Sequence, residues 1–301
     1  MSDEFDLLDE LMDLHDSDPS NDQKFDRKTM IRAPFGMPGA KFFSLERLLP
    51  HLPVTPKSMW VDHFGGSGIV SWNVPLCANM IYNDRYSGVC NFYRVVRERP
   101  EELIQYLEMM PNHSREEWFY CKNTWVTEKD ELVRAAKWYY MVRLSVIGKG
   151  QCFGRGIELK ATGMQISPFL EVIRKLSYRL KVFTLENLDW RVMCNDYNRP
   201  HAVHYMDPPY IGTDTGLYEH KFKREDLLEL LATIPQLSGF VALSHYDNED
   251  IAEQSYWDYH VTWQVPVNSE TNTENTKGKS DRMHMNDPKM VTEHLWIKEP
   301  N

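Results

Sequence analysis

Short apolar runs alternate with longer amphipathic stretches along most of this chain. Apolar residues spaced three or four positions apart predict helices at 44–53, 86–110, 129–148 and 166–180, the second of them with a break at Pro100. The apolar runs predict strands at 59–64, 80–84, 181–185, 202–206, 239–244, 259–265 and 293–297. Strands that alternate with helices indicate an α/β fold with a mostly parallel sheet, and such sheets bind ligands at the carboxyl ends of their strands.

A helical block between the second and third predicted strands interrupts the alternation. We therefore expect an α/β domain in two parts, 29–105 and 166–301, with a second, mainly helical domain inserted at 106–165. Residues 111–165 carry nine Lys and Arg against six Asp and Glu. The inserted block is locally basic, although the whole chain has a net charge of −10.

Most of the negative charge lies in the first residues. Residues 1–23 hold nine acidic residues and no Lys or Arg, so we expect 1–28 to be a disordered acidic tail. Leu7, Leu8, Leu11 and Leu14 have helical spacing, which leaves a short helix that binds a protein partner as an alternative to a solvated tail. The polar stretch 268–282 predicts a mobile loop.

Composition narrows the function classes. No run of ~18 apolar residues occurs, and the acidic start differs from a signal peptide, so we expect a cytoplasmic protein without a membrane span. The five cysteines are scattered and form no CxxC pair, and no His, Asp or Glu cluster has metal-ligand spacing. We expect neither a disulfide framework nor a bound metal.

A glycine turn follows the first predicted strand. The stretch DHFGGSG, residues 62–68, lies before a predicted helix, and its glycines allow the backbone to approach a ligand closely. Asp84 ends the next strand, where nucleotide-binding sheets place an acid on ribose hydroxyls. The turn is neither GxGxxG nor a Walker loop, so it favours adenosine with a short charged appendage. The alternative for the turn alone is a tight strand–helix connection.

The stretch DPPY, residues 207–210, follows the strand AVHYM. Two prolines fix the backbone, so the Asp207 carboxylate and the Pro208 carbonyl form a rigid pair of acceptors, and Tyr210 can stack a flat ring beside them. Such a pair suits an aromatic amino group, whose nitrogen gains positive charge when a sulfonium methyl is transferred to it. An ordinary turn at a strand end is the alternative.

These motifs resemble the Dam-type DNA adenine-N6 methyltransferases. The resemblance covers most of 31–298 in the family's order: APFGMPGAK (33–41), DHFGGSG, YNDRYSGVCNFYRVVRERPEEL (82–103), AAKWYYMVRLSVIGKGQCFGRG (135–156), LENLDW (185–190), DPPY, FVALSHYDNE (240–249) and TEHLWI (292–297). Two positions depart from the family pattern: Ala40 stands at a glycine position, and Met37 stands where the family often has an aromatic residue.

The resemblance implies a Rossmann-like methyltransferase sheet with an inserted, mainly helical DNA-recognition domain. It implies S-adenosyl-L-methionine as cofactor, double-stranded DNA as substrate, and a flipped adenine as the methyl acceptor. Asp207, Pro208, Pro209 and Tyr210 would form the catalytic motif. The cofactor residues would be Phe35, Met37, Gly39, Lys41, Asp62, Phe64, Gly66, Gly68, Asp84, Asp189, Trp190 and Asp207. We expect DNA contacts from Arg143, Lys149, Arg155, Lys277, Lys279 and Arg282.

Other interpretations stay open at this point. The same DPPY chemistry would serve N4 of cytosine or an RNA base. A non-catalytic DNA-binding relative, and an interaction protein that works through its acidic tail, are alternatives from other classes. The resemblance fits a restriction–modification enzyme in a bacterial cell, encoded by a bacterium or a phage.

Overall fold

A seven-stranded mixed sheet forms the centre of the computed structural model, which describes residues 29–37, 39–154, 166, 169–211, 222–267 and 289–300. The strand order is β3-β2-β1-β4-β5-β7-β6. The first five of these pair in parallel, and β7 runs antiparallel to both β5 and β6. The strands are β1 (Met59–Asp62), β2 (Asn79–Asn83), β3 (Phe183–Glu186), β4 (Ala202–Met206), β5 (Phe240–His245), β6 (Tyr259–Val267) and β7 (Lys289–Lys298). This arrangement confirms the predicted α/β class.

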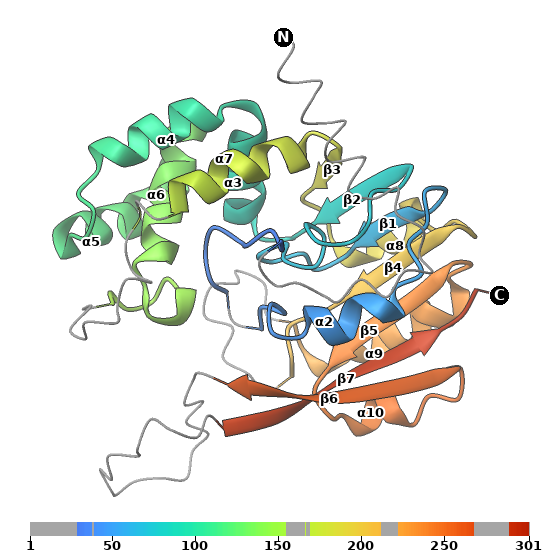
Figure 1. Cartoon of the computed structure of the whole chain (residues 1–301). Coiled ribbons are helices and arrows are strands. Elements are labelled where there is room, and N and C mark those ends of the chain that lie inside the picture. The colour runs from blue at the N-terminus through green and yellow to red at the C-terminus, as the bar shows by residue number, and fades with distance from the viewer. Residues whose placement is uncertain are drawn as a thin grey trace, which may run out of the picture.

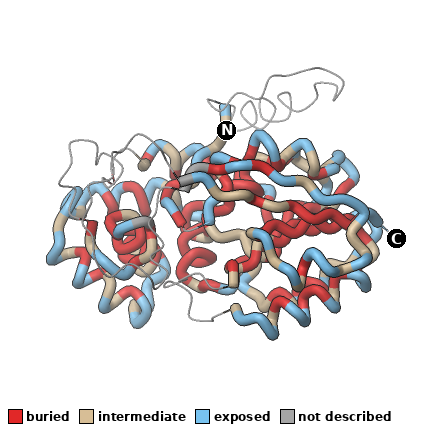
Figure 2. The backbone as a smooth tube through the Cα atoms, turned by 90° about the horizontal axis from the view of Figure 1, so that it is seen from below, coloured by how far each residue is buried: buried red, intermediate tan, exposed pale blue. Residues whose placement is uncertain are grey.

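The chain runs outward from β1 in both directions of the sheet. It first fills one side with β2 and β3, and then crosses to the other side of β1 to form β4 and β5. The carboxyl ends of β1 and β4 therefore lie at the point where the strand order reverses, and parallel sheets bind their ligands in a crevice at such a point. All five residues of β4 are buried, which explains its continuous apolar sequence. Figure 2 shows the buried strands between outer elements that reach the solvent.

Two hydrophobic layers cover the sheet. On one face, α8 (Trp190–Asp196), α9 (Arg224–Thr233) and α10 (Glu249–Ala252) pack on Met206, Val241 and Leu243. The 3-10 helix η6 (Ile234–Gln236) follows α9 and adds Ile234 to the same layer. On the other face, Leu45 and Leu48 of α2 (Leu45–Leu48) belong to the larger cluster, and η1 (Leu49–His51) continues α2 (Figure 1).

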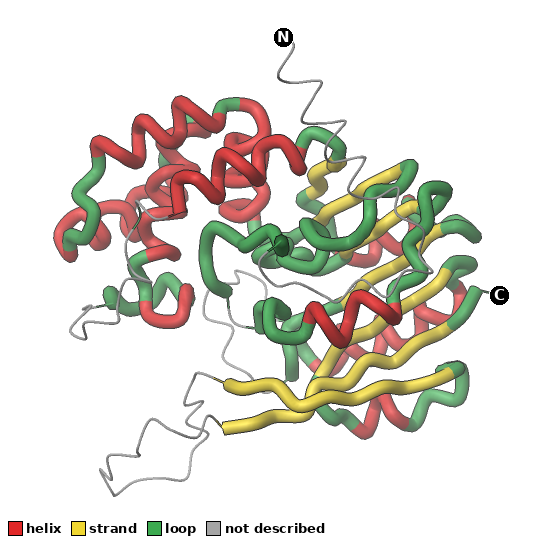
Figure 3. Tube along the Cα trace, viewed as in Figure 1, coloured by secondary structure: helices red, strands yellow, loops and turns green. Residues whose placement is uncertain are grey.

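The block between β2 and β3 is helical and packs beside one end of the sheet (Figure 3). Its core is aromatic: the Phe35 ring lies 5.0 Å from Trp138 and 5.5 Å from Phe92, between centroids. The same hydrophobic cluster continues from the sheet into these helices. The elements are α3 (Ser87–Glu98), α4 (Pro100–Met109), α5 (Arg115–Thr124), η2 (Trp125–Thr127), α6 (Glu131–Arg143), η3 (Val146–Gly148) and α7 (Leu170–Leu180).

Local chemistry sets the ends of these helices. Pro100 opens α4, which explains the break between α3 and α4, and the Asp130 carboxylate caps α6 by accepting from two backbone amides, those of Leu132 and Val133. The prediction that this helix reaches residue 148 was wrong. It ends at Arg143, because the Ser145 hydroxyl bonds to the backbone on both sides of the following turn and Gly148 has a positive φ of 67°.

The expected helix after the glycine turn was also wrong. Residues 66–73 form consecutive turns without a helix. Side chains take the backbone groups that a helix would need, since the Trp72 indole donates to the Ser67 carbonyl and the Asn73 amide donates to the carbonyls of Ile31 and Ile69. The turn therefore acts through its own backbone geometry, without a helix dipole.

The predicted tail at 1–28 and the predicted loop at 268–282 lie outside the described residues. Among the helices of the described segments, none combines the length and the apolar character needed to cross a membrane.

Candidate active site

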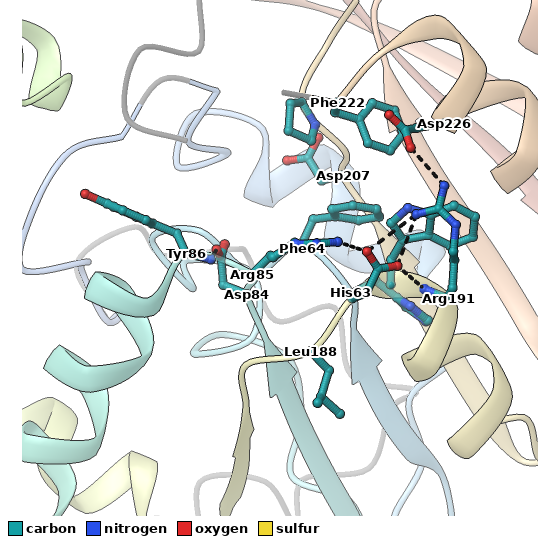
Figure 4. A pocket seen from close by; sticks show the side chains of 13 residues that line it. His63, Phe64, Asp84, Arg85, Tyr86, Leu188, Arg191, Asp207, Phe222 and Asp226 are labelled. Atoms are coloured by element: carbon teal, nitrogen blue, oxygen red, sulfur yellow. Dashed lines mark hydrogen bonds and ion pairs between the residues drawn. The ribbon is translucent and has the colours of Figure 1, made fainter. Parts of the chain in front are cut away.

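A pocket opens at the carboxyl ends of the parallel strands, beside the reversal of strand order. His63 and Phe64 follow β1, Asp84 follows β2, and Asp207 follows β4. Figure 4 shows the side chains of Asp84, Asp207 and Arg191 around the Phe64 ring. The remaining lining residues are Arg85, Tyr86, Leu188, Asp189, Trp190, Pro209, Phe222 and Asp226.

The glycine turn holds the Asp84 carboxylate in place. Gly66 N–H donates to Asp84 Oδ2 at 2.8 Å, and Tyr86 N–H donates to Oδ1 at 2.7 Å. Burial raises the pKa of Asp84 to about 6, although these two amides oppose the rise. Each oxygen keeps a further lone pair, so Asp84 can still accept a hydroxyl donor from a ligand.

Aromatic packing explains why glycine is needed in the turn. A Cβ on Gly65 would lie 2.1 Å from the Tyr82 ring, and a Cβ on Gly68 would lie 2.1 Å from the Trp72 ring. Gly68 also has a φ of +69°. The turn is therefore a tight connection after β1, as the alternative interpretation of the sequence had it. The same turn also contacts Asp84.

Asp62 lies behind the turn and does not line the pocket. The Ser71 hydroxyl donates to its Oδ2 at 2.6 Å, whereas Oδ1 is buried without a hydrogen bond in the described part of the chain. Burial is the main cause that raises the pKa of Asp62 to about 8, with a smaller contribution from the nearby Asp207 charge.

Charged side chains frame the other end of the pocket. Asp189 caps α8 through the Arg191 backbone amide and forms ion pairs with Arg85 and Arg191. The Arg191 guanidinium lies 4.5 Å from the centre of the Trp190 ring and also pairs with Asp226 at 2.8 Å. A flat apolar surface thus lies next to carboxylates, a combination that suits a nucleoside.

Asp207 binds Lys41 with one oxygen, and its other oxygen contacts no hydrogen-bonding group among the described residues. Lys41 Nζ lies 2.8 Å from Asp207 Oδ2. Asp207 Oδ1 is buried and has no hydrogen-bond partner within the described residues. An unpartnered buried carboxylate oxygen is costly, and it is therefore a strong acceptor for a donor that enters the pocket.

Lys41 reaches Asp207 from a loop far away in the sequence. Its side chain is 2% exposed, and its ammonium also donates to the Gly39 carbonyl at 3.0 Å. Burial alone would lower the pKa of Lys41, but the charges of Asp207 and Glu293 raise it above the ordinary value. Lys41 is therefore a permanent cation in this site.

The Tyr210 hydroxyl joins the same buried cluster. It accepts from Lys41 Nζ at 2.7 Å and donates to Glu293 Oε2 at 3.0 Å. The Ser244 hydroxyl lies 3.3 Å away. The Tyr210 ring packs on His245 and Tyr246 at centroid distances of 4.5 and 4.4 Å.

The predicted cofactor residues separate into two groups. Of these, Phe64, Asp84, Asp189, Trp190 and Asp207 line the pocket. The structure places Phe35 in the aromatic core of the helical block instead, and Met37 is buried near Gly66, whose Cβ would lie 3.9 Å from the Met37 sulfur. Gly39, Lys41 and Gly66 act through neighbours, by contacts to Lys41, Asp207 and Asp84 respectively.

Two of the predicted DNA contacts are described. The Arg143 guanidinium lies 3.6 Å from the centre of the Phe169 ring and its Nε and Nη2 are buried without partners in the described segments, so this side chain is packed rather than freely solvated. Lys149 is half-buried beside η3. Arg155, Lys277, Lys279 and Arg282 lie outside the described residues.

Sequence reasoning missed several members of the site. Arg85 and Tyr86 directly follow Asp84, so their position after a predicted strand was visible in the sequence. Glu293 was visible as a charged residue inside a predicted strand. His63 gave no signal. Its Nε2 lies 3.0 Å from His204 Nδ1, and burial lowers the pKa of both rings, that of His204 to about 4. Both imidazoles are therefore neutral at pH 7.

The described residues contain no group of three or more His, Cys, Asp or Glu placed to hold a metal ion. The arrangement is chemically suited to a planar nucleoside at the Asp189 and Trp190 end and to a hydrogen-bond donor at Asp207 Oδ1. The Cys194 thiol lies 3.9 Å from Nδ1 of the pocket residue His63, but burial raises the pKa of this thiol to about 12, so the pair does not supply a thiolate nucleophile.

Comparison with known proteins agrees with this geometry. A family model described as D12 class N6 adenine-specific DNA methyltransferase matches residues 38–265. The chain is also 28% identical over 247 residues to the Type II methyltransferase M1.LlaDCHI of Lactococcus lactis subsp. cremoris, covering 71% of this chain and 82% of that protein.

Proposed function

This chain belongs to the D12 class of N6 adenine-specific DNA methyltransferases, and we propose that its pocket moves a methyl group from S-adenosyl-L-methionine to N6 of an adenine flipped out of duplex DNA. Adenine-N6 DNA methylation is the activity of the family. The family assignment thus selects adenine among the planar amino bases that the DPPY motif allows. The roles of individual residues below are our proposal.

The pocket suits the adenosine part of S-adenosyl-L-methionine. Asp84 has lone pairs left for ribose hydroxyls, Trp190 and Leu188 offer apolar surface to a base, and Asp189 offers a carboxylate beside them. Met37, Gly39, Lys41, Asp62, Gly66 and Gly68 support this surface from behind, and Phe35 anchors the loop that carries three of them. When bound, the cofactor supplies an electrophilic methyl group on a sulfonium.

The observation that carries the proposal is that the buried Asp207 Oδ1 has no hydrogen-bond partner in the described part of the chain. It can accept one N6 hydrogen, and the Pro208 carbonyl can accept the other, because Pro208 and Pro209 fix the direction of that carbonyl. The two acceptors stabilise the positive charge that develops on nitrogen during transfer. Lys41 fixes the other carboxylate oxygen, so Asp207 is oriented before the base arrives.

Duplex DNA would contact the helical block and the segment after β6. We assign target recognition to 106–165 and phosphate contacts to Lys149, Arg155, Lys277, Lys279 and Arg282, because basic side chains supply most of the affinity for DNA. The base must leave the stack, since the acceptors lie in a pocket that a paired base cannot enter. Stacking on aromatic side chains of the site offsets part of the cost of flipping.

The biological setting is proposed by similarity. The Lactococcus relative is named a Type II methyltransferase, so we propose that this chain serves in restriction–modification. We propose that it acts on DNA in the cytoplasm of a bacterial cell, as the product of a bacterial or phage gene. A protein partner for the acidic segment 1–28 stays an alternative to a solvated tail.

Single-turnover methylation of a short duplex, read by the mass of the methylated nucleoside, tests the proposal. We expect N6-methyladenine from the wild-type protein and a rate about 10²–10³ lower from Asp207→Ala, because one preorganised acceptor is lost. DNA binding should persist, because the side chain lies in the pocket and not on the helical block. Product on cytosine, or a normal rate for Asp207→Ala, would refute the assignment.

A further inference from the structure

Glu293 is a buried carboxylate that methyl transfer as described above does not use. Its residue is 5% exposed, on β7, and its Oε2 accepts from the Tyr210 hydroxyl at 3.0 Å and lies 3.8 Å from Lys41 Nζ. Tyr210 and Lys41 are thus held between two carboxylates, Asp207 on the pocket side and Glu293 on the sheet side.

The charges in this cluster do not cancel. Lys41 supplies one positive charge, and Asp207 and Glu293 supply two negative charges when ionised. The other titratable groups that act on Lys41 or the two carboxylates are Tyr205, Tyr210, Tyr246, His245 and Asp62. Burial raises the pKa of the tyrosines and of Asp62 and lowers that of His245, so these five groups are neutral near pH 7.

The pKa of Glu293 lies above its ordinary value, because burial and the nearby Asp207 charge raise it more than the Lys41 charge and the hydrogen bonds from Tyr210 and Ser244 lower it. Lys41 and the Tyr210 hydroxyl stabilise the charged form of the buried Glu293 carboxylate. With both carboxylates ionised, the cluster carries a net charge of −1 behind the pocket.

We propose that Glu293 is a positioning residue that gives this cluster its net negative charge, so that the site prefers the sulfonium cofactor to its uncharged thioether product. This inference rests on the proposed function. Glu293 also holds Tyr210 and Lys41 in place, which keeps Asp207 Oδ2 occupied and Oδ1 available. The same charge favours the transition state, in which positive charge moves from sulfur toward nitrogen.

The preference has a consequence for turnover. Methyl transfer converts the sulfonium cation into a neutral thioether, and the departing positive charge leaves with the methylated amino group and then as a proton from its nitrogen. A negative cluster therefore binds the substrate form of the cofactor more tightly than the product form. The product is released more easily because its favourable charge interaction has been lost.

Glu293→Gln is the direct test, because it keeps the shape and one acceptor oxygen for Tyr210 but removes the charge. Titration calorimetry would give the affinities for S-adenosyl-L-methionine and S-adenosylhomocysteine in the absence of DNA. We expect the ratio of the two affinities to fall several-fold in the variant, mainly through weaker binding of the cation. We expect kcat to fall about tenfold or more, with little change in the KM for DNA.

Glu299→Gln is the matched control, since it removes the same charge just after the same strand from an exposed residue. It should leave both affinities and kcat unchanged. Glu293→Asp retains the charge with a shorter side chain, so it should recover the affinity ratio even where kcat stays low. A merely structural role would lower thermal stability in both Glu293 variants without changing the ratio.

An unchanged affinity ratio in folded Glu293→Gln, with normal methylation by the wild-type protein, would overturn the inference alone. A wild-type protein that binds the cofactor but makes no N6-methyladenine would instead refute the proposed function. If Glu293→Gln fails to fold, Glu293→Asp decides, because loss of the ratio in that charge-retaining variant contradicts an electrostatic role.

Discussion

At the scale of single residues, the Tyr210 hydroxyl has a larger role than its aromatic ring suggests. The DPPY motif predicts stacking by the ring, and a hydroxyl contributes little to stacking. In the structure the hydroxyl joins Lys41 to Glu293 inside the protein, and His245 and Tyr246 pack against the ring. Two buried charged groups therefore depend on one oxygen atom.

Tyr210→Phe should consequently be damaging. Removing the hydroxyl leaves a donor of Lys41 and an acceptor of Glu293 unsatisfied, which costs roughly 1–3 kcal/mol of unfolding free energy. We also expect a lower rate of methylation, because Lys41 is held less firmly against Asp207. Chemical denaturation and single-turnover methylation would measure both effects, and a variant that matches the wild type in both would show that the hydroxyl is dispensable.

Asp62 makes a prediction about pH. The buried carboxyl has a pKa of about 8, above its unfolded value, so the folded state binds the proton more tightly. Wild-type stability should therefore fall as the pH rises from about 4 toward 8 on account of this group. Asp62→Asn has no carboxyl group to titrate, so its stability should not fall with pH for this reason. Its amide oxygen can still accept from the Ser71 hydroxyl.

Denaturation of the wild type and Asp62→Asn at pH 5 and pH 9 would test this sign. We expect the variant to gain on the wild type between pH 5 and pH 9 by up to about 4 kcal/mol, because roughly three pH units separate pH 5 from the folded pKa of about 8. A difference between the two proteins that stays constant with pH would show that Asp62 does not titrate as the structure implies.

The sequence identified the part of the site that lies in contiguous motifs. Asp84, Asp189, Trp190 and Asp207 each follow a predicted strand directly or stand in a recognisable stretch, and all four line the pocket. Glu293 could not be assigned to the site, because the pairing of β7 with β5 brings it there. The register between strands that lie far apart in the sequence cannot be predicted from either strand alone. The packing of Arg143 on Phe169 could not be predicted for the same reason, since only the fold brings these two residues together.

At the scale of elements, the turn after α6 packs against the loop that carries Lys41 to Asp207. Gly148 has a φ of +67°, and a Cβ there would lie 2.0 Å from the Gly36 carbonyl oxygen. The Tyr139 hydroxyl donates to the nearby Pro34 carbonyl at 3.2 Å. The loop that carries Lys41 to Asp207 is thus held at its start by α6 and η3.

Gly148→Ala should displace this loop. We expect a loss of stability of roughly 2–4 kcal/mol, from backbone strain and the clash together, and a lower rate of methylation because Lys41 moves. Gly39→Ala is the control for strain alone, since Gly39 has a φ of +81° but open space around its Cβ position, and it should cost only ~1–2 kcal/mol. Equal losses of stability in the two variants would contradict the contact.

Prediction from the sequence was more accurate for the strands than for the helices. The seven strands of the described sheet were predicted within a few residues, because strands with buried faces contain apolar runs. The helices α5, α8, α9 and α10 were not predicted, and α6 was drawn too long. Apolar periodicity continued past Arg143, whereas the end of the helix is decided by Ser145, whose hydroxyl bonds to Val142 and Gly150, and by a glycine turn.

At the scale of the whole molecule, net charge does not predict the partner. The chain has a net charge of −10, yet its family methylates DNA. Nine acidic residues lie in 1–23, apart from the basic block, so a DNA-binding surface is compatible with the total. The salt dependence of binding is therefore more informative than the isoelectric point.

Lys149→Ala combined with Arg155→Ala should weaken DNA binding and reduce the slope of log affinity against log salt by about 0.9 for each lost phosphate contact. Lys57→Ala is the control, because this exposed lysine precedes β1 at the amino end of the strand, whereas the pocket lies at the carboxyl ends. Arg143→Ala should instead lower stability and leave the slope unchanged, because its guanidinium packs on Phe169. A slope that changes only with Arg143 would reverse these assignments.

The buried cluster around Tyr210 also sets when during biosynthesis the enzyme becomes active. Tyr210 lies 169 residues after Lys41 and 83 residues before Glu293, whereas α5 and α6 of the helical block contact each other and are neighbours along the chain. A ribosome delivers β7 after all the other strands, and domains fold as their segments emerge. We expect a nascent chain to form its helical block early and to gain its catalytic centre only when β7 has been synthesised and inserted between β5 and β6. We therefore expect each newly made molecule to methylate DNA only after β7, the last strand to be synthesised, has joined the sheet.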